Sequence, residues 1–182
     1  MGIIVVTGIP GVGKTTVMKK AAEGMDIQFV TFGTVMIDIA QETGLVKDRD
    51  EMRKLTLEQQ KNLQIKTAEK VAGMGNVILD THCTVKTPKG YMPGLPEWVI
   101  KKLKPTAIVL VEAYPEEIYN RRANDSTRNR DPDTQEQIHE HQMINRSAAM
   151  AYAALSGSTV KIVFNHDNAI DAAVKQASPV LE

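Results

Sequence analysis

The sequence predicts an α/β protein, a three-layer sandwich in which helices cover both faces of a five-stranded parallel β-sheet. Two observations support this fold class. Short apolar runs alternate along the chain with longer helical patterns, which is the order in which a parallel sheet and its crossover helices are built. Two of these runs, VILD and AIVLVEA, are almost continuously apolar, as is typical of strands buried on both faces.

The predicted elements alternate from the first residues onward. Strand character is present in Ile3–Thr7, Ile27–Phe32, Val77–His82, Ala107–Ala113 and Thr159–Asn165. Helical patterns are present in Lys14–Ala22, Thr34–Glu42, Leu57–Ala72, Glu116–Ala123, Thr134–Leu155 and Ala169–Ala177. Because ligands of such folds bind at the carboxyl ends of the strands, functional residues are expected there.

Single residues support several of these helices. Val35 and Ile39 are spaced by one helical turn in the helix that follows the second strand. The next helix is long and rich in Gln and Lys. Gly157 ends the longest helix, at the position where glycine is preferred. Trp98 and Leu103 are expected to pack a further helix.

Two long stretches interrupt the alternation. Thr84–Glu97 contains three prolines and two glycines, and Asn124–Asp133 is polar and charged throughout. Both are too polar to be core, and both follow closely on strand ends. Long ordered loops in compact domains are often lids or binding segments, so a functional role is predicted for each, with a plain surface connection as the alternative.

The composition narrows the classes of function. The chain has 182 residues, 42% of them apolar, which fits one globular domain spanning residues 1–182. Basic and acidic residues balance at 22 each, so no overall charge favours nucleic acid or an anionic membrane, and any anion site must be local. With one cysteine, no signal peptide and no apolar run near the roughly 20 residues of a membrane span, a soluble cytoplasmic protein is expected.

The segment GIPGVGKT follows the first predicted strand and opens a helix, and it matches the P-loop motif G-x-x-x-x-G-K-[ST] in full. A P-loop binds the phosphates of a nucleoside triphosphate through backbone N–H groups and the positive end of the helix. Lys14 is expected to bridge the β- and γ-phosphates, Thr15 to reach Mg²⁺ and Thr16 to support the α-phosphate. The predicted nucleotide-binding residues of this P-loop NTPase fold are Gly8, Ile9, Pro10, Gly11, Val12, Gly13, Lys14, Thr15 and Thr16.

Charged side chains elsewhere complete a predicted phosphate site. Asp80 ends the run VILD, beside the P-loop strand, so Thr15 and Asp80 are the predicted Mg²⁺ ligands, and a capping or turn aspartate is the alternative. Five arginines within 26 positions have planar forks that suit phosphate oxygens, and a solvated basic face is the alternative. These arginines are Arg121, Arg122, Arg128, Arg130 and Arg146.

The kind of phosphoryl acceptor can also be argued from residue types. The sequence lacks the N-K-x-D and D-x-x-G elements of GTPases. A hydroxyl acceptor needs a base, whereas a phosphate acceptor is largely ionised at neutral pH because its second pKa is about 6. Since cationic side chains are many and base candidates few, the sequence favours a phosphate acceptor, a nucleoside monophosphate.

Longer blocks of sequence point to a family. The chain resembles the archaeal-type adenylate kinases, nearly end to end, in GIPGVGKTT, FGTVM, DRDEMRKL, LDTH followed by TPKGYMPGLP, RRANDSTRNRD and the final VKIVFN. The resemblance implies an NMP-kinase-like core and the Mg²⁺-dependent reaction ATP + AMP ⇌ 2 ADP. It also implies an AMP-binding region over about 31–72, a lid over about 125–133 and a homotrimer.

The resemblance implies roles on the AMP side. Arg53 is expected to bind the AMP phosphate, and Gly33 and Met36 to line the AMP pocket. Gln64 is expected to read the adenine edge, because a carboxamide donates and accepts together. Bacterial-type adenylate kinases carry a D-G-x-P-R pattern where this chain has D-T-H, so His82 or the following loop is expected to replace that arginine.

The resemblance implies that the transferring phosphoryl group is held by arginines from the predicted lid and its flanking helices. The catalytic residues it implies are Lys14, Arg122, Arg128 and Arg130, with Arg146 as a further candidate. The loop near 165–168, after the fifth strand, is expected to lie against the adenine of ATP.

Three other side chains have plainer explanations. His139 and His141 lie two apart on a helix and so on different faces, which argues against a metal pair and predicts solvated side chains. Cys83 has no partner cysteine and is expected to be a bystander.

Two other functions remain open. One is a P-loop kinase that acts on another nucleotide, or on a small hydroxyl metabolite with Asp80 as base. The other is a binding protein that hydrolyses ATP slowly.

Overall fold

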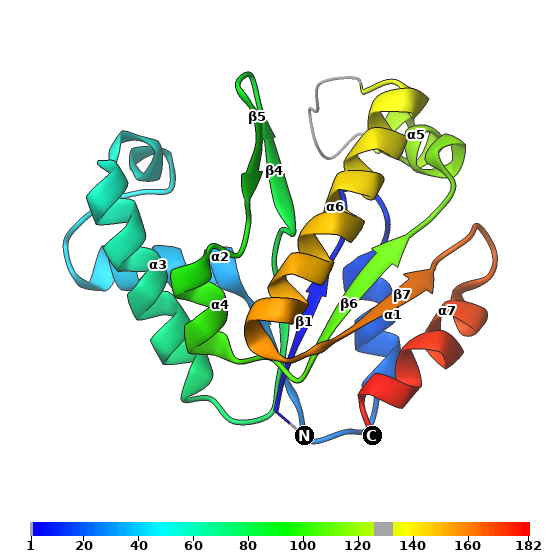
Figure 1. Cartoon of the computed structure of the whole chain (residues 1–182), viewed down its shortest axis with the longest axis horizontal. Helices are drawn as coiled ribbons and strands as arrows, with labels where there is room; N and C mark the ends of the chain where they lie inside the picture. The colour runs from blue at the N-terminus through cyan, green and yellow to red at the C-terminus, as the bar shows by residue number, and fades with distance from the viewer. Residues whose placement is uncertain (1, 126–132) are drawn as a thin grey trace.

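A computed structural model describes residues 2–125 and 133–182 of the chain. The main sheet has five parallel strands in the order β2-β3-β1-β6-β7, which confirms the predicted fold class (Figure 1). Its strands are β1 (Ile3–Thr7), β2 (Gln28–Thr31), β3 (Val77–Asp80), β6 (Ala107–Glu112) and β7 (Thr159–Phe164). Because β1 lies between β3 and β6, the loop that follows it leaves the middle of the sheet.

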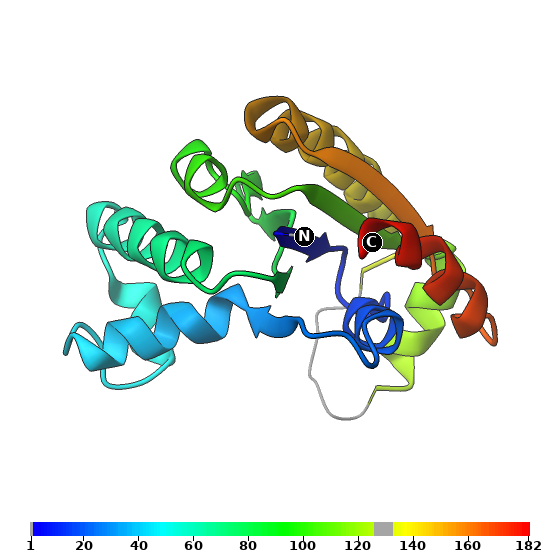
Figure 2. The same ribbon diagram turned by 90° about the horizontal axis from the view of Figure 1, so that it is seen from below.

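Helices cover both faces of the sheet, which gives three layers (Figure 2). One apolar cluster joins the sheet to α2, α3, α4 and the C-terminal part of α6, and a second joins it to α1, α5, α7 and Ile138 near the start of α6. The helices are α1 (Lys14–Ala21), α2 (Phe32–Glu42), α3 (Leu57–Ala72), α4 (Glu97–Leu103), α5 (Pro115–Ala123), α6 (Gln135–Ser156) and α7 (Ile170–Ala177), with short 3₁₀ helices η1 (Asp50–Lys54) and η2 (Ser178–Val180).

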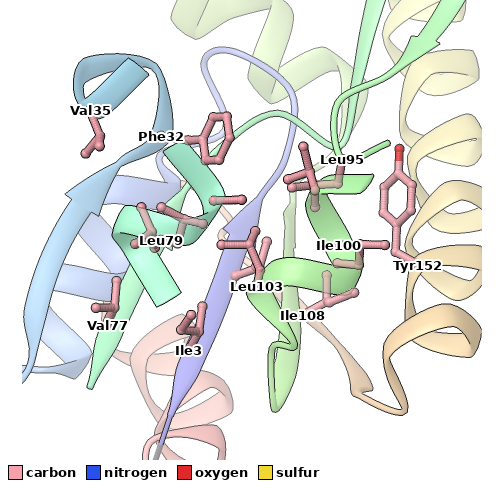
Figure 3. Close-up of a cluster of buried hydrophobic side chains, with 14 of the residues drawn as sticks. Ile3, Phe32, Val35, Val77, Leu79, Leu95, Ile100, Leu103, Ile108 and Tyr152 are labelled. Carbon is pink, nitrogen blue, oxygen red and sulfur yellow. The ribbon is translucent and has the colours of Figure 1, made fainter. Parts of the chain in front are cut away.

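The alternation of side chains along β1 builds both clusters. Ile3 and Val5 belong to the first cluster, and Ile4 and Val6 belong to the second. All four side chains are at most 5% exposed, which explains why this strand reads as continuously apolar. Figure 3 shows the first cluster, in which side chains of the sheet meet others from α4 and α6, such as Tyr152.

The stretch 84–97 corrects a sequence-based expectation. It forms an antiparallel hairpin of β4 (Thr84–Thr87) and β5 (Gly90–Pro93), which rises above the sheet in Figure 1. The expectation that the stretch is too polar for the core was wrong, because Leu95 is fully buried. Its prolines hid the strands: they occupy the turn, the end of β5 and the position before α4, where no ladder bond is lost.

The other predicted elements agree closely with the structure. Each of the five strands and six helices is present, and their ends lie within two residues of the predicted ones. Trp98 and Leu103 lie on α4, as expected. Most of the predicted lid, including Arg128 and Arg130, falls outside the described residues. Within the described ranges, no helix combines the length and apolarity needed to cross a bilayer.

Candidate active site

The loop between β1 and α1 has a backbone that requires glycine at both ends. Gly8 and Gly13 have φ angles of 151° and 82°. A Cβ atom on Gly8 would lie 2.5 Å from the backbone oxygen of Val111, and one on Gly13 would lie 2.5 Å from Asn165 Nδ2. The two glycines of the motif therefore serve packing as well as backbone freedom.

Interactions from other elements hold this loop in shape. The side chains of Ile9 and Val12 are buried in the second apolar cluster. Asn165 Nδ2 donates to the backbone oxygen of Val12 at 2.8 Å, and Arg122 Nε donates to that of Pro10 at 2.8 Å. The protein's own side chains thus hold the P-loop in shape, so the loop does not need a ligand to order it.

The helix that follows the loop presents its amino terminus to the same place. Its first turn carries Lys14, Thr15 and Thr16. Among the described residues, no side chain caps this end of α1 with a hydrogen bond. Backbone N–H groups at a helix start lack intrahelical partners and carry partial positive charge. Loop and helix together therefore form a site suited to an anion such as phosphate.

The predicted magnesium residues come together at the carboxyl edge of the sheet. β1 and β3 are neighbours with Val6 opposite Asp80, which brings Asp80 to the P-loop. Thr15 Oγ1 donates to Asp80 Oδ2 at 3.2 Å, and Lys14 Nζ lies 3.5 Å from Asp80 Oδ1. In the described part of the chain, no group of three or more His, Cys, Asp or Glu side chains could form a metal cage. One carboxylate and one hydroxyl do suit Mg²⁺ that is bound mainly by phosphates and water.

His82 lies beyond this cluster, after β3. Burial lowers the pKa of His82 below 6.5, Lys14 lowers it further, and Asp80 opposes them. The imidazole is therefore mostly neutral at pH 7, and it offers one N–H donor without a permanent charge. This differs from the arginine that bacterial-type enzymes carry near this point.

Two adjoining cavities share Met36, Met52 and Arg53; the first lies between α2, η1 and α3, and the second lies between α2 and η1. One, of about 240 Å³, is lined by Met36, Met52, Arg53, Gln60, Leu63 and Gln64. The other, of about 220 Å³, is lined by Gly33, Met36, Ile37, Arg49, Asp50, Met52 and Arg53. The structure thus brings together four of the five residues predicted for AMP, and His82 is not among the described residues that line these cavities.

The cavity residues that sequence reasoning missed are mostly apolar or belong to η1. Met52 lies one residue before Arg53 and lines both cavities. Gln60 lies one turn before Gln64 on α3, so the helical spacing from Gln64 was a signal that could have found it, whereas Leu63 directly precedes Gln64.

The described arginines differ in their surroundings. Arg122 bonds to the P-loop and also to Asp133, at 2.8 Å. Arg146 is bound by the buried carboxylate of Glu112, with Nε to Oε1 at 2.9 Å, and this hydrogen bond raises the pKa of Arg146. Arg121 bonds to Asp167 at 2.8 Å. Arg121 Nη1 also donates to the backbone oxygen of Val12 at 3.4 Å, so Arg121 and Arg122 both contact the P-loop, and Arg122 makes the shorter bond.

His141 is not solvated, and that expectation was wrong, whereas His139 is exposed as expected. His141 Nε2 lies 3.0 Å from Thr84 Oγ1, and the hydroxyl of Thr84 donates its one proton to Asn145 Oδ1 at 2.6 Å. His141 Nε2 therefore carries the hydrogen. The burial of His141 was missed because the hairpin was not predicted, and β4 covers the face of α6 that carries His141.

Cys83 is a buried bystander, as expected. Its side chain is 1% exposed, and burial raises the pKa of its thiol to about 12. The Cys83 thiol donates to the backbone oxygen of Asn145, and Tyr152 donates to that of Cys83 at 2.8 Å. A thiol with so high a pKa is not a nucleophile at neutral pH.

The loop after β7 lies against the P-loop through Asn165, as the bond to Val12 establishes. The next residue, His166, stacks between two aromatic rings. Its ring centroid is 4.3 Å from that of Tyr114 and 5.8 Å from that of Phe164. Sequence reasoning placed this loop near the adenine of ATP but missed the aromatic neighbours, which come from two different strand ends.

Comparison with known proteins gives a consistent result. A family model described as an AAA domain matches residues 7–139. The adenylate kinase of Methanothermobacter thermautotrophicus is 50% identical over 185 residues and covers 100% of both chains. That of Methanocaldococcus jannaschii is 50% identical over 188 residues, covering 99% of this chain and 98% of the relative. That of Methanopyrus kandleri is 52% identical over 180 residues, covering 96% and 94%.

Solved structures resemble the chain in fold. Shikimate kinase from Acinetobacter baumannii, in complex with shikimate, has a TM-score of 0.61 at 18% identity and covers 100% of this chain and 93% of its own. A gluconokinase from Sinorhizobium meliloti has a TM-score of 0.53 at 16% identity, with coverages of 99% and 91%. At such identities the likeness establishes the P-loop kinase fold alone.

Proposed function

The chain belongs to the archaeal adenylate kinases, and from that membership we propose where its two nucleotides bind and how their phosphates meet. It is a nucleoside monophosphate kinase, a phosphotransferase for the reversible reaction ATP + AMP ⇌ 2 ADP. The residue assignments that follow are supported by the geometry of the P-loop, the cluster around Asp80 and the cavities beside α3.

ATP binds with its phosphates in the loop of residues 8–16. The loop is held in shape by Arg122 and Asn165, and Lys14 reaches the same place. Thr15 and Asp80 hold Mg²⁺ together with the phosphates, which suits their 3.2 Å separation and the preference of Mg²⁺ for one or two carboxylates plus phosphate oxygens. When bound, Mg²⁺ neutralises negative charge on the β- and γ-phosphates.

AMP binds in the two cavities that Met36, Met52 and Arg53 share, and the residues that line them contact different parts of the nucleotide. Arg53 contributes a cation to both cavities and binds the AMP phosphate. Met36 and Met52 offer apolar, adaptable surface for a purine ring. Gln64 supplies the polar contact that reads the base. His82 is assigned to the AMP phosphate as an uncharged donor, because its pKa is lowered.

The chemistry needs alignment and charge stabilisation more than proton transfer. The AMP phosphate is itself the nucleophile, so no side chain has to act as a base, and Asp80 contacts Lys14 and Thr15 instead. Lys14 and Arg122 stabilise charge on the transferring group, joined by Arg128 and Arg130, which lie outside the described residues. Arg146 is left out of this set, because Nε and Nη2 of its guanidinium group both bond to the buried Glu112 carboxylate, whereas Arg122 also bonds to the P-loop.

Four coarser assignments complete the proposal. The AMP-binding region spans about 31–72, and the lid spans about 125–133. A homotrimer is proposed on the family resemblance alone, and a cytoplasmic location is proposed on the composition of the sequence.

The observation that carries the proposal is the cluster of Lys14, Thr15 and Asp80, formed by a complete P-loop motif in a chain about 50% identical to adenylate kinases along its whole length. The test measures ADP formation from ATP with AMP, CMP, UMP, GMP, a hydroxyl acceptor or no acceptor. We expect AMP-dependent turnover and, for Lys14→Ala, a loss on the order of 10² or more in kcat with the fold retained.

The matched control is Lys20→Ala, which removes a lysine of the same helix that pairs on the surface with Asp171. Its turnover should be unchanged, and circular dichroism should confirm that both variants fold. Normal turnover of Lys14→Ala would refute the site. Activity with a hydroxyl acceptor alone, or ATP loss without an acceptor, would support one of the two other functions instead.

A further inference from the structure

Gln64 lies where the acceptor cavity meets α4. Its side chain lines the cavity of about 240 Å³ together with Met36 and Arg53. Its Oε1 also accepts a hydrogen bond of 2.9 Å from Nε1 of Trp98, the second residue of α4. A residue of the neighbouring helix thus holds the one carboxamide that is proposed to read the base.

This hydrogen bond fixes the orientation of the Gln64 carboxamide, that is, whether Oε1 or Nε2 faces Trp98. An indole Nε1–H can donate and cannot accept, so the oxygen of Gln64 must face Trp98. Rotating the amide by half a turn would set its N–H₂ group against the indole N–H and leave donors unpaired. The Nε2 group therefore points away from Trp98. We propose that Trp98 is a positioning residue that sets the base specificity of the acceptor site by locking the amide of Gln64.

Trp98 is itself held in place before any nucleotide binds. Val99, Ile100 and Leu103 of the same helix are at most 2% exposed, so the backbone that carries Trp98 is anchored in the core. On the α3 side, Lys61 Nζ lies 4.8 Å from the centroid of the indole ring, a cation–π contact. The anchored backbone of α4 and the contact with Lys61 both restrict the indole ring, so its Nε1–H keeps its direction toward Gln64.

The locked amide matches the edge of adenine. Adenine presents an acceptor, N1, beside a donor, the 6-amino group. An N–H of Gln64 can donate to N1, while the second lone pair of Oε1 accepts from the amino group. Hypoxanthine and guanine present the opposite pattern, an N1–H donor beside the O6 acceptor, and would need the amide reversed. With Trp98 in place, a 6-oxopurine sets donor against donor and acceptor against acceptor at Gln64.

This inference rests on the proposed placement of AMP beside α3. Its test compares kcat/KM for AMP and for IMP, which differs from AMP at N1 and position 6, in the wild type and in Trp98→Phe. Phenylalanine keeps an aromatic ring and removes the N–H. We expect the AMP-to-IMP ratio to fall roughly tenfold, through the KM of the acceptor, with kcat at saturating AMP and the KM of ATP unchanged.

Two further variants separate positioning from packing. Lys61→Ala removes the contact over the ring and keeps the indole N–H, so its AMP-to-IMP ratio should fall less than that of Trp98→Phe. In a Gln64→Ala background, Trp98→Phe should leave the ratio unchanged, because the group it positions is gone. An equal effect of Trp98→Phe in both backgrounds would indicate packing alone and overturn the inference.

The outcomes also distinguish this inference from the proposed function. If the wild type forms no ADP from AMP, the proposed function fails and the inference falls with it. If Gln64→Ala leaves the KM of AMP unchanged, the placement of Gln64 fails. If AMP is phosphorylated, Gln64 matters and folded Trp98→Phe keeps the wild-type ratio, the inference alone is overturned.

Discussion

Lys14 of the P-loop has a carboxylate partner in this structure, Asp80. Both side chains are largely buried, with 15% and 13% exposed, so their attraction is screened less than that of a surface pair. Asp80 therefore holds the ammonium group at the loop and also accepts a hydrogen bond from Thr15. The carboxylate of Asp80 thus positions both Lys14, which is proposed to bind phosphate, and Thr15, which is proposed to bind the metal ion.

Arg53 is expected to act on one substrate only. Because it lines both cavities beside α3 and is proposed to bind the AMP phosphate, Arg53→Ala removes a charge-assisted contact to AMP. We expect the KM of AMP to rise roughly tenfold or more while the KM of ATP changes little. Steady-state kinetics with each nucleotide varied in turn would measure this.

The control for Arg53 is its neighbour in η1. Lys54 is exposed, pairs with Glu51 on the surface and is not among the described residues that line either cavity. Lys54→Ala should therefore leave both KM values unchanged. An Arg53→Ala enzyme with the wild-type KM for AMP would remove Arg53 from the acceptor site.

At the scale of secondary-structure elements, the β4–β5 hairpin is fixed directly on the segment that follows β3. The backbone N–H of Gly94 donates to the backbone oxygen of Cys83 at 2.8 Å. A Cβ atom on Gly94 would lie 2.0 Å from the backbone oxygen of His82 and 2.8 Å from that of Cys83. Glycine at this position thus allows the hairpin to lie against the backbone that carries Asp80 and His82.

Gly94→Ala is expected to push these two segments apart. The contact is with backbone atoms, which cannot rotate away, so the change should destabilise the fold by about 1–3 kcal/mol. The Tm should fall by several degrees, roughly 2–4 °C per kcal/mol for a chain of this size. Activity should fall as well, because the segment after β3 moves. Calorimetry and kcat would measure both effects.

Gly73→Ala is the matched control for this prediction. A Cβ atom on Gly73 would lie 3.5 Å from the nearest backbone oxygen, an ordinary contact, and its φ of −80° suits any residue. The Tm of this variant should stay close to that of the wild type. A wild-type Tm and kcat for Gly94→Ala would contradict the tight approach of the hairpin.

At the scale of the whole molecule, the stability of the fold should depend on pH through a buried histidine. Burial lowers the pKa of His141 below 6.5; the charges of Arg122 and Lys86 lower it too, while Thr84 and Asp133 oppose the shift. Between the lowered pKa and 6.5 the unfolded chain binds more protons than the folded chain. The free energy of unfolding should therefore decrease as pH falls through this window and stay level above it.

The His141→Gln variant isolates this contribution, because glutamine retains an N–H donor for Thr84 and does not titrate. Denaturant unfolding between pH 8 and pH 5 should give a smaller loss of stability in the variant than in the wild type. His82, whose pKa is also lowered, contributes equally to both curves. Parallel curves for the two proteins would contradict the shift at His141.

The parallel sheet and the phosphate loop could be predicted because both are local signals. A strand buried on both faces reads as a continuous apolar run, as in β3 and β6, and the P-loop is contiguous in sequence. The hairpin could not be predicted, because its prolines argued against strands and its packing against α6 joins segments that are far apart in the sequence. The burial of His141 was missed for the same reason.

The candidate site was predicted unevenly, for a related reason. Motif residues such as Lys14 and Asp80 were predicted, and the structure brings them together. The supporting roles of Glu112 and Trp98 were missed, and Asn165 was predicted to lie near the adenine of ATP but not to bond to the P-loop backbone. Contacts of this kind depend on which elements lie side by side, and that information is absent from any single stretch of sequence.

Trp98 is the single tryptophan of the chain, and its indole nitrogen is bonded to a side chain that lines the acceptor cavity. Its ultraviolet emission therefore originates from one place in the molecule, a few atoms from the proposed base. The enzyme carries a built-in optical reporter for the second nucleotide: AMP should change the intensity or wavelength of that light, and titrating this change would follow occupancy of one subsite without any attached dye.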